Sequence, residues 1–128
     1  MAGQLLLDTD VLIDYLRAHT EAVTYITSLS DSLSISVITV AELYAGVRDG
    51  AERAALEVFI RAFLILPINH DIAVKGGLYR RDYGKSHSVG LADALIGATV
   101  EHHQATLVTL NNKHFPMLTN VVVPYQKP

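Results

Sequence analysis

The stretch LLLDTDVLIDYL, from Leu5 to Leu16, decides the fold of this chain. Its apolar start predicts a short buried strand over Gln4–Leu7, which runs into the carboxylate of Asp8. A helix over Asp10–Arg17 follows, because apolar side chains recur there four residues apart, and Thr9 or Asp8 supplies its cap. A strand that leads directly into a helix is typical of parallel α/β folds. It also places an acid at the carboxyl end of the first strand.

The composition is that of one globular domain spanning residues 1–128. Half of the residues are hydrophobic (50%) and 18% are charged, which excludes a disordered or fibrous chain. The absence of cysteine excludes disulfides and thiolate zinc sites. No apolar stretch is long enough to cross a bilayer and no signal peptide is recognisable, so we expect a cytoplasmic protein without a membrane partner. With a net charge of −3, binding of nucleic acid would need local basic patches or metal ions.

Strand and helix patterns alternate along the rest of the chain. Apolar and β-branched runs predict further strands over Leu33–Ile38, Leu64–Ile68, Ala105–Leu110 and Val121–Val123. Helical spacing predicts helices over Glu21–Leu29, Val40–Val47, Glu52–Phe63, Asp71–Asp82 and Leu91–His103. Short strands separated by helices indicate a parallel sheet wrapped by helices.

Three acids stand out because their surroundings are apolar. Glu42 is the one charged residue in the segment 33–47, and Asp93 is the one in 86–100 when the histidine there is neutral. We therefore expect both to be at least partly buried, and Asp8 ends an apolar strand. Each lies just beyond a predicted strand or in the first turns of a helix, and in a parallel sheet those places share one edge. The sequence thus predicts that Asp8, Glu42 and Asp93 converge.

Each acid alone also has a purely structural interpretation. Thr39-x-x-Glu42 fits a capping box, in which Glu42 reaches back to the backbone N–H of Thr39. Asp93 lies near a helix start, where the helix dipole favours an acid, and Asp8 could simply cap the first helix. These interpretations compete with a shared site.

Converging carboxylates repel one another, so either their pKa values rise or a cation holds them together. Oxygen ligands without cysteine or paired histidine suit Mg²⁺ or Mn²⁺ rather than zinc. Such an ion can activate a water and stabilise the leaving oxygen of a phosphodiester. Asn111 directly follows the strand ATLVTL at the same predicted edge. It could supply a neutral oxygen or be an ordinary turn residue.

Four segments together resemble, in chain order, the signature segments of PIN domains, most closely those of the VapC-type ribonuclease toxins of bacterial toxin–antitoxin pairs. They are LLLDTDVLIDYL, ITVAELYAGV, GLADALIGATV and TLVTLNNKHFPM, and the resemblance covers nearly the whole chain. It implies a three-layer α/β/α domain with a central, mainly parallel sheet and a metal-dependent endoribonuclease site. Carried onto this chain, the acidic site is Asp8, Glu42 and Asp93 around Mg²⁺ or Mn²⁺, with Asn111 at the fourth position.

Two positions depart from the family pattern. The fourth position is often Asp in PIN domains and is Asn111 here, which keeps an oxygen but loses a charge, so a second metal should bind more weakly. The position two residues after the first acid is commonly Asn and is Asp10 here, a candidate to support the ligands from behind. Thr9 is expected to orient the site and its substrate through its hydroxyl, or to cap the helix. Asp14 is expected on a solvated helix face.

Positive charge for binding a substrate is expected in two places. The segment KGGLYRRDYGKSH gathers basic side chains around two tyrosines, and there Lys85 is a candidate to contact RNA, although a solvated helix end is an equally good interpretation. Arg17, Arg48, Lys113 and His114 lie near the predicted active edge and are candidates to meet phosphates.

Partners follow from the resemblance. VapC-type toxins form homodimers and bind a cognate antitoxin that covers or enters the acidic site, where an arginine of the partner would be attracted. We therefore expect an RNA substrate, a cognate antitoxin and a homodimer.

Three other functions remain open at this stage. A PIN-like domain could bind RNA or protein without cutting. A phosphatase could use Asp8 as a covalent nucleophile in an Asp-x-Asp motif, although that family expects Thr or Val where Leu12 stands. A receiver-like signalling module would need an aspartate at the end of the third strand, where Asn69 stands.

Overall fold

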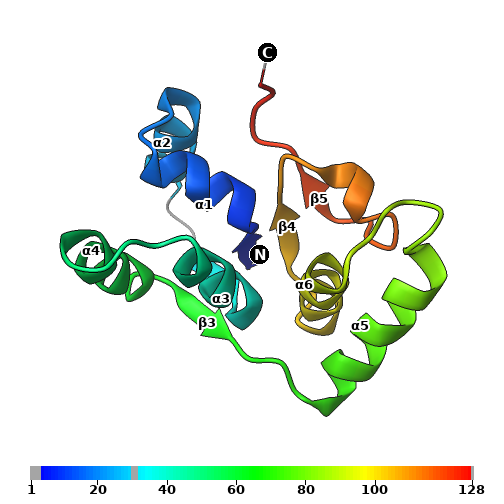
Figure 1. Cartoon of the computed structure of the whole chain (residues 1–128). Helices are drawn as coiled ribbons and strands as arrows, with labels where there is room; N and C mark the ends of the chain where they lie inside the picture. Colours follow the sequence, from blue (N-terminus) through cyan, green and yellow to red (C-terminus); the bar gives the residue numbers. More distant parts are fainter. Residues whose placement is uncertain (1–3, 30–31, 128) are drawn as a thin grey trace.

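A computed structural model describes residues 4–29 and 32–127 and contains a parallel five-stranded sheet (Figure 1). The strands are β1 Leu5–Leu7, β2 Leu33–Ser36, β3 Leu64–Leu66, β4 Thr106–Val108 and β5 Val121–Val122. Their order is β3-β2-β1-β4-β5, and every neighbouring pair is parallel. The central strand β1 therefore lies between β2 and β4. A receiver-like module instead has its first strand between the second and third, so this order excludes it.

Six α-helices and one short 3₁₀ helix connect the strands in the described part of the chain. They are α1 Thr9–Leu16, α2 Thr20–Thr27, α3 Val37–Ala45, α4 Ala51–Ile60, α5 His70–Tyr83, α6 Leu91–His102 and η1 Asn112–His114. Within the residues described, no helix combines the length and the apolar character needed to span a bilayer.

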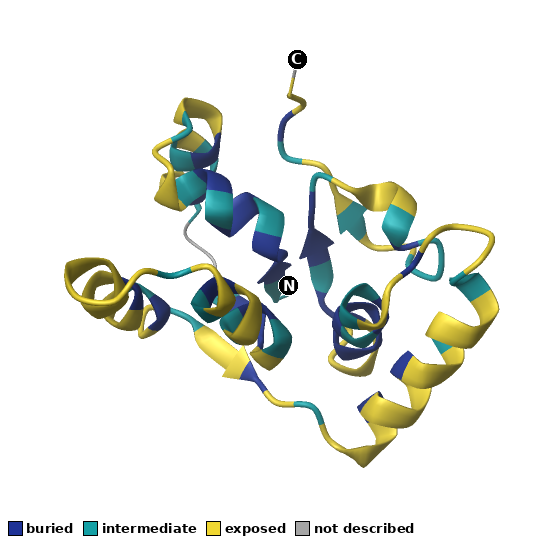
Figure 2. Cartoon of the chain, viewed as in Figure 1, coloured by how far each residue is buried: buried dark blue, intermediate teal, exposed yellow. Residues whose placement is uncertain are grey.

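The alternation of side chains along β1 separates two hydrophobic cores. Leu7 packs on one face with Ile35 and with buried side chains of α1 to α4. Leu6 packs on the other face with Leu107, Phe115 and side chains of α6. Figure 2 shows the buried residues gathered on the central strands and on the sides of the helices that face them. Helices cover both faces, so the predicted three-layer α/β/α fold is confirmed.

Helix α5 lies against α6, outside the three layers (Figure 1). The close approach depends on Gly76, because a Cβ there would lie 2.5 Å from Leu95 Cδ2 and 3.2 Å from Leu95 Cα. Gly76 within a predicted helix therefore reflects packing against a neighbouring helix, which offsets its poor helix propensity.

The predicted capping box at the start of α3 is wrong. The helix begins at Val37, and the hydroxyl of Ser36 caps it by accepting from the backbone N of Ile38 at 3.0 Å. Thr39 therefore lies inside the helix, where it is completely buried. Glu42 is consequently available for another partner.

The prediction that Asp14 lies on a solvated face is also wrong. Asp14 is 4% exposed, because the C-terminal segment folds back over the end of α1. Its carboxylate accepts hydrogen bonds from Tyr125 Oη at 2.8 Å and from Lys127 Nζ at 2.6 Å. The Tyr125 ring stacks on His19 with centroids 5.3 Å apart. Burial alone would raise the pKa of Asp14, but these hydrogen bonds outweigh it and hold the pKa below its ordinary value.

Removing the Tyr125 hydroxyl should therefore destabilise the protein. We expect Tyr125→Phe to lower the free energy of unfolding by about 1.5–3 kcal/mol, because the buried Asp14 carboxylate loses a hydrogen bond. Urea unfolding measures the change. Tyr79→Phe is the matched control, since Tyr79 donates to the more exposed carboxylate of Glu101 and should cost less than about 1 kcal/mol. Equal losses in the two variants would contradict the burial argument.

Candidate active site

Asp8 lies between β1 and α1 and forms hydrogen bonds with the start of the helix and with the neighbouring strand β4. It is the N-cap of α1, with Oδ1 accepting from the backbone N of Thr9 at 2.8 Å. Its own backbone N donates to the carbonyl of Val108 on β4 at 2.9 Å. Only 6% of Asp8 is exposed. The strand-to-helix junction therefore holds a buried carboxylate at the carboxyl edge of the sheet.

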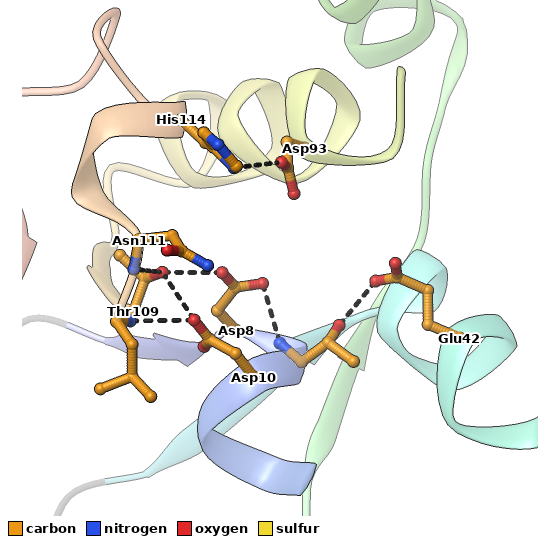
Figure 3. A network of polar contacts seen from close by, with 9 residues as sticks. Asp8, Asp10, Glu42, Asp93, Thr109, Asn111 and His114 are labelled. Carbon is orange, nitrogen blue, oxygen red and sulfur yellow. Dashed lines mark hydrogen bonds and ion pairs between the residues drawn. The ribbon is translucent and has the colours of Figure 1, made fainter. Parts of the chain in front are cut away.

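Sequence analysis missed Thr109, whose hydroxyl connects Asp8 and Asp10 to the segment that follows β4. Its Oγ1, directly after β4, donates to Asp8 Oδ2 at 2.8 Å and lies 3.4 Å from Asp10 Oδ2 (Figure 3). The backbone N of Asn111 donates to the same hydroxyl at 3.0 Å. Thr109 is completely buried. The one signal for it was a hydroxyl within the apolar run ATLVTL, at the expected end of a strand.

Asp10 lies in the first turn of α1, and its carboxylate accepts hydrogen bonds from two backbone N–H groups. Its Oδ2 accepts from the backbone N of Leu110 at 3.0 Å, and its Oδ1 accepts from the backbone N of Val11 at 2.7 Å. Asp10 therefore ties the first turn of α1 to the chain that follows β4.

Glu42 reaches this edge from α3, but it is exposed, so the prediction of partial burial is wrong for it. The helix turns the neighbouring Leu43 into the core and Glu42 toward solvent. Glu42 Oε1 accepts from Thr9 Oγ1 at 2.7 Å, and Thr9 Oγ1 lies 3.0 Å from Thr39 Oγ1. One polar chain thus links α1 to α3.

Asp93 lies in the first turn of α6, and its side chain is 29% exposed, as its apolar surroundings predicted. Its Oδ2 is 3.2 Å from Nδ1 of His114 in η1 (Figure 3). His114, a candidate to meet phosphates, thus has its ring Nδ1 directed to Asp93.

Burial and mutual repulsion shift the pKa values at this edge upward. Burial raises the pKa of Asp8 to about 7, with repulsion from Asp10 and Asp93 adding to the effect and hydrogen bonds from Thr109 and Thr9 opposing it. Burial also raises the pKa of Asp10. Burial raises the pKa of Asp93 against the opposing influence of His114, and the charge of Glu42 raises it further. Each of the three aspartates therefore lies close enough to another acid for that charge to raise its pKa.

The remaining candidates lie around this cluster to different degrees. Asn111 is exposed and directly precedes η1, on the side of Asp8 in Figure 3. Lys113 is exposed in η1 itself, whereas Lys85 is exposed in the segment after α5. Arg48 is exposed and forms an ion pair with Glu52 at 2.9 Å.

A cavity of about 570 Å³ opens between α1, α3 and α4 beside Glu42. Apolar side chains form much of its wall, and Arg17, Arg48 and Glu52 also line it. Asp8 and Asp93 do not line it. The cavity therefore adjoins the acidic edge through Glu42 alone.

A sequence profile of the PIN domain matches residues 5–118, a range that includes Asp8, Glu42, Asp93 and Asn111. The chain belongs to the PIN-domain family. The matched range contains all four signature segments.

Relatives of this PIN domain align over nearly its entire length. Ribonuclease VapC10 of Mycobacterium tuberculosis is 38% identical over 127 residues, 97% of this chain and 95% of that protein. Ribonuclease VapC19 of the same species is 37% identical over 124 residues, 94% and 98% of the two chains. A toxin–antitoxin complex from Klebsiella pneumoniae contains a chain with a TM-score of 0.83 and 30% identity, covering 96% of this chain and 99% of that one. FitAcB from Neisseria gonorrhoeae has a TM-score of 0.75 and 31% identity over 94% and 97%.

The donor chemistry of this PIN domain fits a hard divalent cation. In the described ranges no lysine or arginine forms an ion pair with Asp8, Asp10, Glu42 or Asp93, although burial and repulsion raise the pKa values of the three aspartates. Oxygen ligands of this kind suit Mg²⁺ or Mn²⁺. No three histidine or acidic side chains among residues 4–29 and 32–127 are arranged as a ready metal cage. In the described residues, oxygen donors therefore lie at one edge of the sheet without forming a ready cage.

Burial of the charged Asp8 carboxylate should lower the free energy of unfolding of the metal-free protein. An acid whose pKa rises on folding, here from 3.8 to about 7, destabilises the fold progressively as pH rises between these values, and fully above them. We expect Asp8→Asn to raise the free energy of unfolding of the metal-free protein on the order of 2 kcal/mol at about pH 8, with a smaller gain at about pH 5. Denaturant unfolding in chelator measures both.

Asp49→Asn is the control, because Asp49 is an exposed acid that pairs with Arg53. It should leave stability within about 0.5 kcal/mol of the parent. An Asp8→Asn protein that is less stable than the parent at about pH 8 would contradict an uncompensated charge at this position.

Proposed function

We propose that this chain is a divalent-metal-dependent endoribonuclease and the toxin of a type II toxin–antitoxin pair. The observation that carries the proposal is a set of acids without lysine or arginine partners in the described structure, gathered at the carboxyl edge of a PIN-domain sheet. Two relatives that align with nearly the whole chain are ribonucleases.

In this proposal Asp8, Glu42 and Asp93 hold one Mg²⁺ or Mn²⁺, and Asn111 offers a neutral oxygen at the fourth position. When bound, the ion supplies Lewis-acid activation of water and neutralises charge at the scissile phosphodiester. The hydroxyl of Thr109 and the N–H of Thr9 orient the Asp8 carboxylate from two sides. Asp10 holds the first turn of α1 in place. Hydrogen bonds within the protein thus already orient the Asp8 carboxylate, whereas binding of a cation would have to draw the other acids toward it.

The same hydrogen bonds weigh against Asp8 as a covalent nucleophile, the role that a phosphatase would require. Both of its oxygens already accept hydrogen bonds, which lowers their nucleophilicity. Orientation of a ligand uses those bonds directly, so the nuclease proposal accounts for them better.

Contacts to the RNA backbone are assigned to basic and hydroxyl side chains around the edge. Lys113 is the strongest candidate, because it is exposed in η1 one residue before His114, which contacts Asp93. Lys85 is exposed in the segment after α5. Thr9 lies at the start of α1, where its hydroxyl donates to Glu42. Arg48 would have to leave or share its ion pair with Glu52.

A cognate antitoxin is the proposed protein partner. Solved relatives above 25% identity include a toxin–antitoxin complex, and an anion-rich edge is a natural target for an arginine of such a partner. We also propose a homodimer, to which exposed apolar side chains such as Leu78 and Leu91 could contribute.

A PIN domain that binds RNA or protein without cutting it is the second candidate. Asn111 at the fourth position favours it, as does the lack, within the described ranges, of three acidic or histidine side chains arranged as a metal cage. Cleavage measurements separate the two.

The purified protein should cut a labelled RNA pool when Mg²⁺ or Mn²⁺ is present and stop when the ion is chelated. We expect Asp93→Asn to lower the rate by at least about 100-fold, because the cation loses a charged ligand. Asp82→Asn is the control, since Asp82 is an acid on the exposed side of α5 and pairs with Arg81. Cleavage by Asp93→Asn at the parental rate, or parental cleavage in chelator, would refute the proposed site.

Backbone contacts should appear in the salt dependence of RNA binding. We expect Lys113→Ala in the Asp93→Asn background to weaken binding and to reduce the slope of log K against log salt by about 0.7, the value for one lost phosphate contact on a single strand. Arg48→Ala should change the slope less, because Glu52 already neutralises that guanidinium. A larger loss for Arg48→Ala than for Lys113→Ala would reverse the assignment.

A further inference from the structure

The hydroxyl of Thr39 is buried without an obvious structural task. Thr39 is completely inaccessible to solvent within α3, and its hydroxyl lies 3.0 Å from the hydroxyl of Thr9. In the described structure this is the one hydrogen bond formed by the Thr39 side chain. A buried hydroxyl needs a partner, so its place opposite Thr9 constrains both residues.

Counting protons gives this chain of groups a direction. The Thr9 hydroxyl lies between Glu42 Oε1, at 2.7 Å, and Thr39 Oγ1, at 3.0 Å. A carboxylate can only accept, and a hydroxyl has only one proton to donate. Thr9 therefore donates to Glu42, and the proton between the two threonines must come from Thr39. Without the Thr39 hydroxyl, Thr9 keeps its proton but loses the donor that fixes the rotation of its own hydroxyl.

Glu42 needs such support more than the other acids do. It is exposed, its side chain is long, and the hydrogen bond from Thr9 is its one hydrogen bond or ion pair among the described residues. Holding a glutamate in one rotamer costs more side-chain entropy than holding most other side chains. Asp8 and Asp93 are shorter and are held by burial or by direct contacts.

We propose that Thr39 is a positioning residue, which holds the Glu42 carboxylate at the acidic edge through Thr9 and thereby sets the affinity of the site for a divalent cation. The proposal rests on the proposed function in one respect, namely that Glu42 is a metal ligand. The positioning itself depends only on the chain Thr39–Thr9–Glu42. Because Thr39 is completely buried, it can act only through other residues.

Removing the Thr39 hydroxyl without changing its shape tests the proposal. Thr39→Val should weaken the binding of Mn²⁺ alone, measured by calorimetry without RNA, by about 10-fold or more, as expected for loss of a residue that orients a ligand. RNA cleavage should fall in proportion when Mn²⁺ is limiting and recover as Mn²⁺ is raised. Thr39→Ser keeps the hydroxyl and should stay within about threefold of the parent.

Thr99→Val is the matched control. Thr99 is also completely buried, but its hydroxyl donates to the carbonyl of Leu95 within α6 at 2.8 Å, away from the acids. It should lose some stability and keep the parental Mn²⁺ affinity. If Thr39→Val fails to fold, Thr39→Ala compared with Thr39→Ser isolates the same hydroxyl in smaller side chains.

A structure of each metal-free variant separates this proposal from the proposed function. In the parent and Thr39→Ser, the Glu42 carboxylate should stay within 3.5 Å of Thr9 Oγ1, and in Thr39→Val it should leave. If the parent binds no Mn²⁺ and cuts no RNA while Glu42 still moves in Thr39→Val, the nuclease assignment fails and the positioning stands. If Glu42 keeps its place in Thr39→Val, or if the parent binds Mn²⁺ and Thr39→Val binds it equally well, the positioning role is refuted.

Discussion

A hydrogen bond from the hydroxyl of Thr109 to the carboxylate of Asp8 joins the two central strands at the edge where the acids meet. The two residues are 101 positions apart in sequence. They become neighbours because β1 and β4 run parallel with Leu7 opposite Val108, so the next residue of each strand leaves the sheet at the same place. A slip of one residue would turn the Thr109 hydroxyl to the other face of the sheet. The register of this strand pair therefore controls the geometry of the site.

Two buried acids at the ends of helix α1 differ in whether they have a cationic partner. Asp14, near the end of the helix, is buried but receives hydrogen bonds from Tyr125 and Lys127, which lower its pKa. Asp8, at the start of the helix, is buried to a similar degree without a cationic partner, and its pKa rises to about 7. The first arrangement stabilises the protein. The second leaves a buried carboxylate without a cationic partner, which costs stability and is typical of functional sites.

Much of the fold could be predicted because periodicity is a local property. The strands and helices lie within a few residues of their predicted bounds, and the rule that parallel strands share a carboxyl edge placed Asp8 and Asp93 at the same edge of the sheet, where the charge of Asp93 adds to the rise in the pKa of Asp8. Local patterns failed where a distant segment supplies the partner. Asp14 looked solvated because nothing near it in sequence indicates the return of Tyr125. Thr39-x-x-Glu42 looked like a capping box because Ser36, the residue that caps α3 in the structure, lies only about one helical turn before Thr39.

The sequence by itself determined the class of fold and the family, because these depend on residue types and on their order along the chain, and it singled out Asp8, Glu42 and Asp93 as candidates. Tertiary structure decided which group orients each acid: Thr109 for Asp8, His114 for Asp93, and Thr9 for Glu42 with Thr39 behind it. It also decided which of the basic side chains proposed to contact RNA already form an ion pair, as Arg48 does with Glu52. The physical reason is that hydrogen bonds act over about 3 Å. Whether two side chains come that close depends on strand register and helix packing, which no single segment encodes.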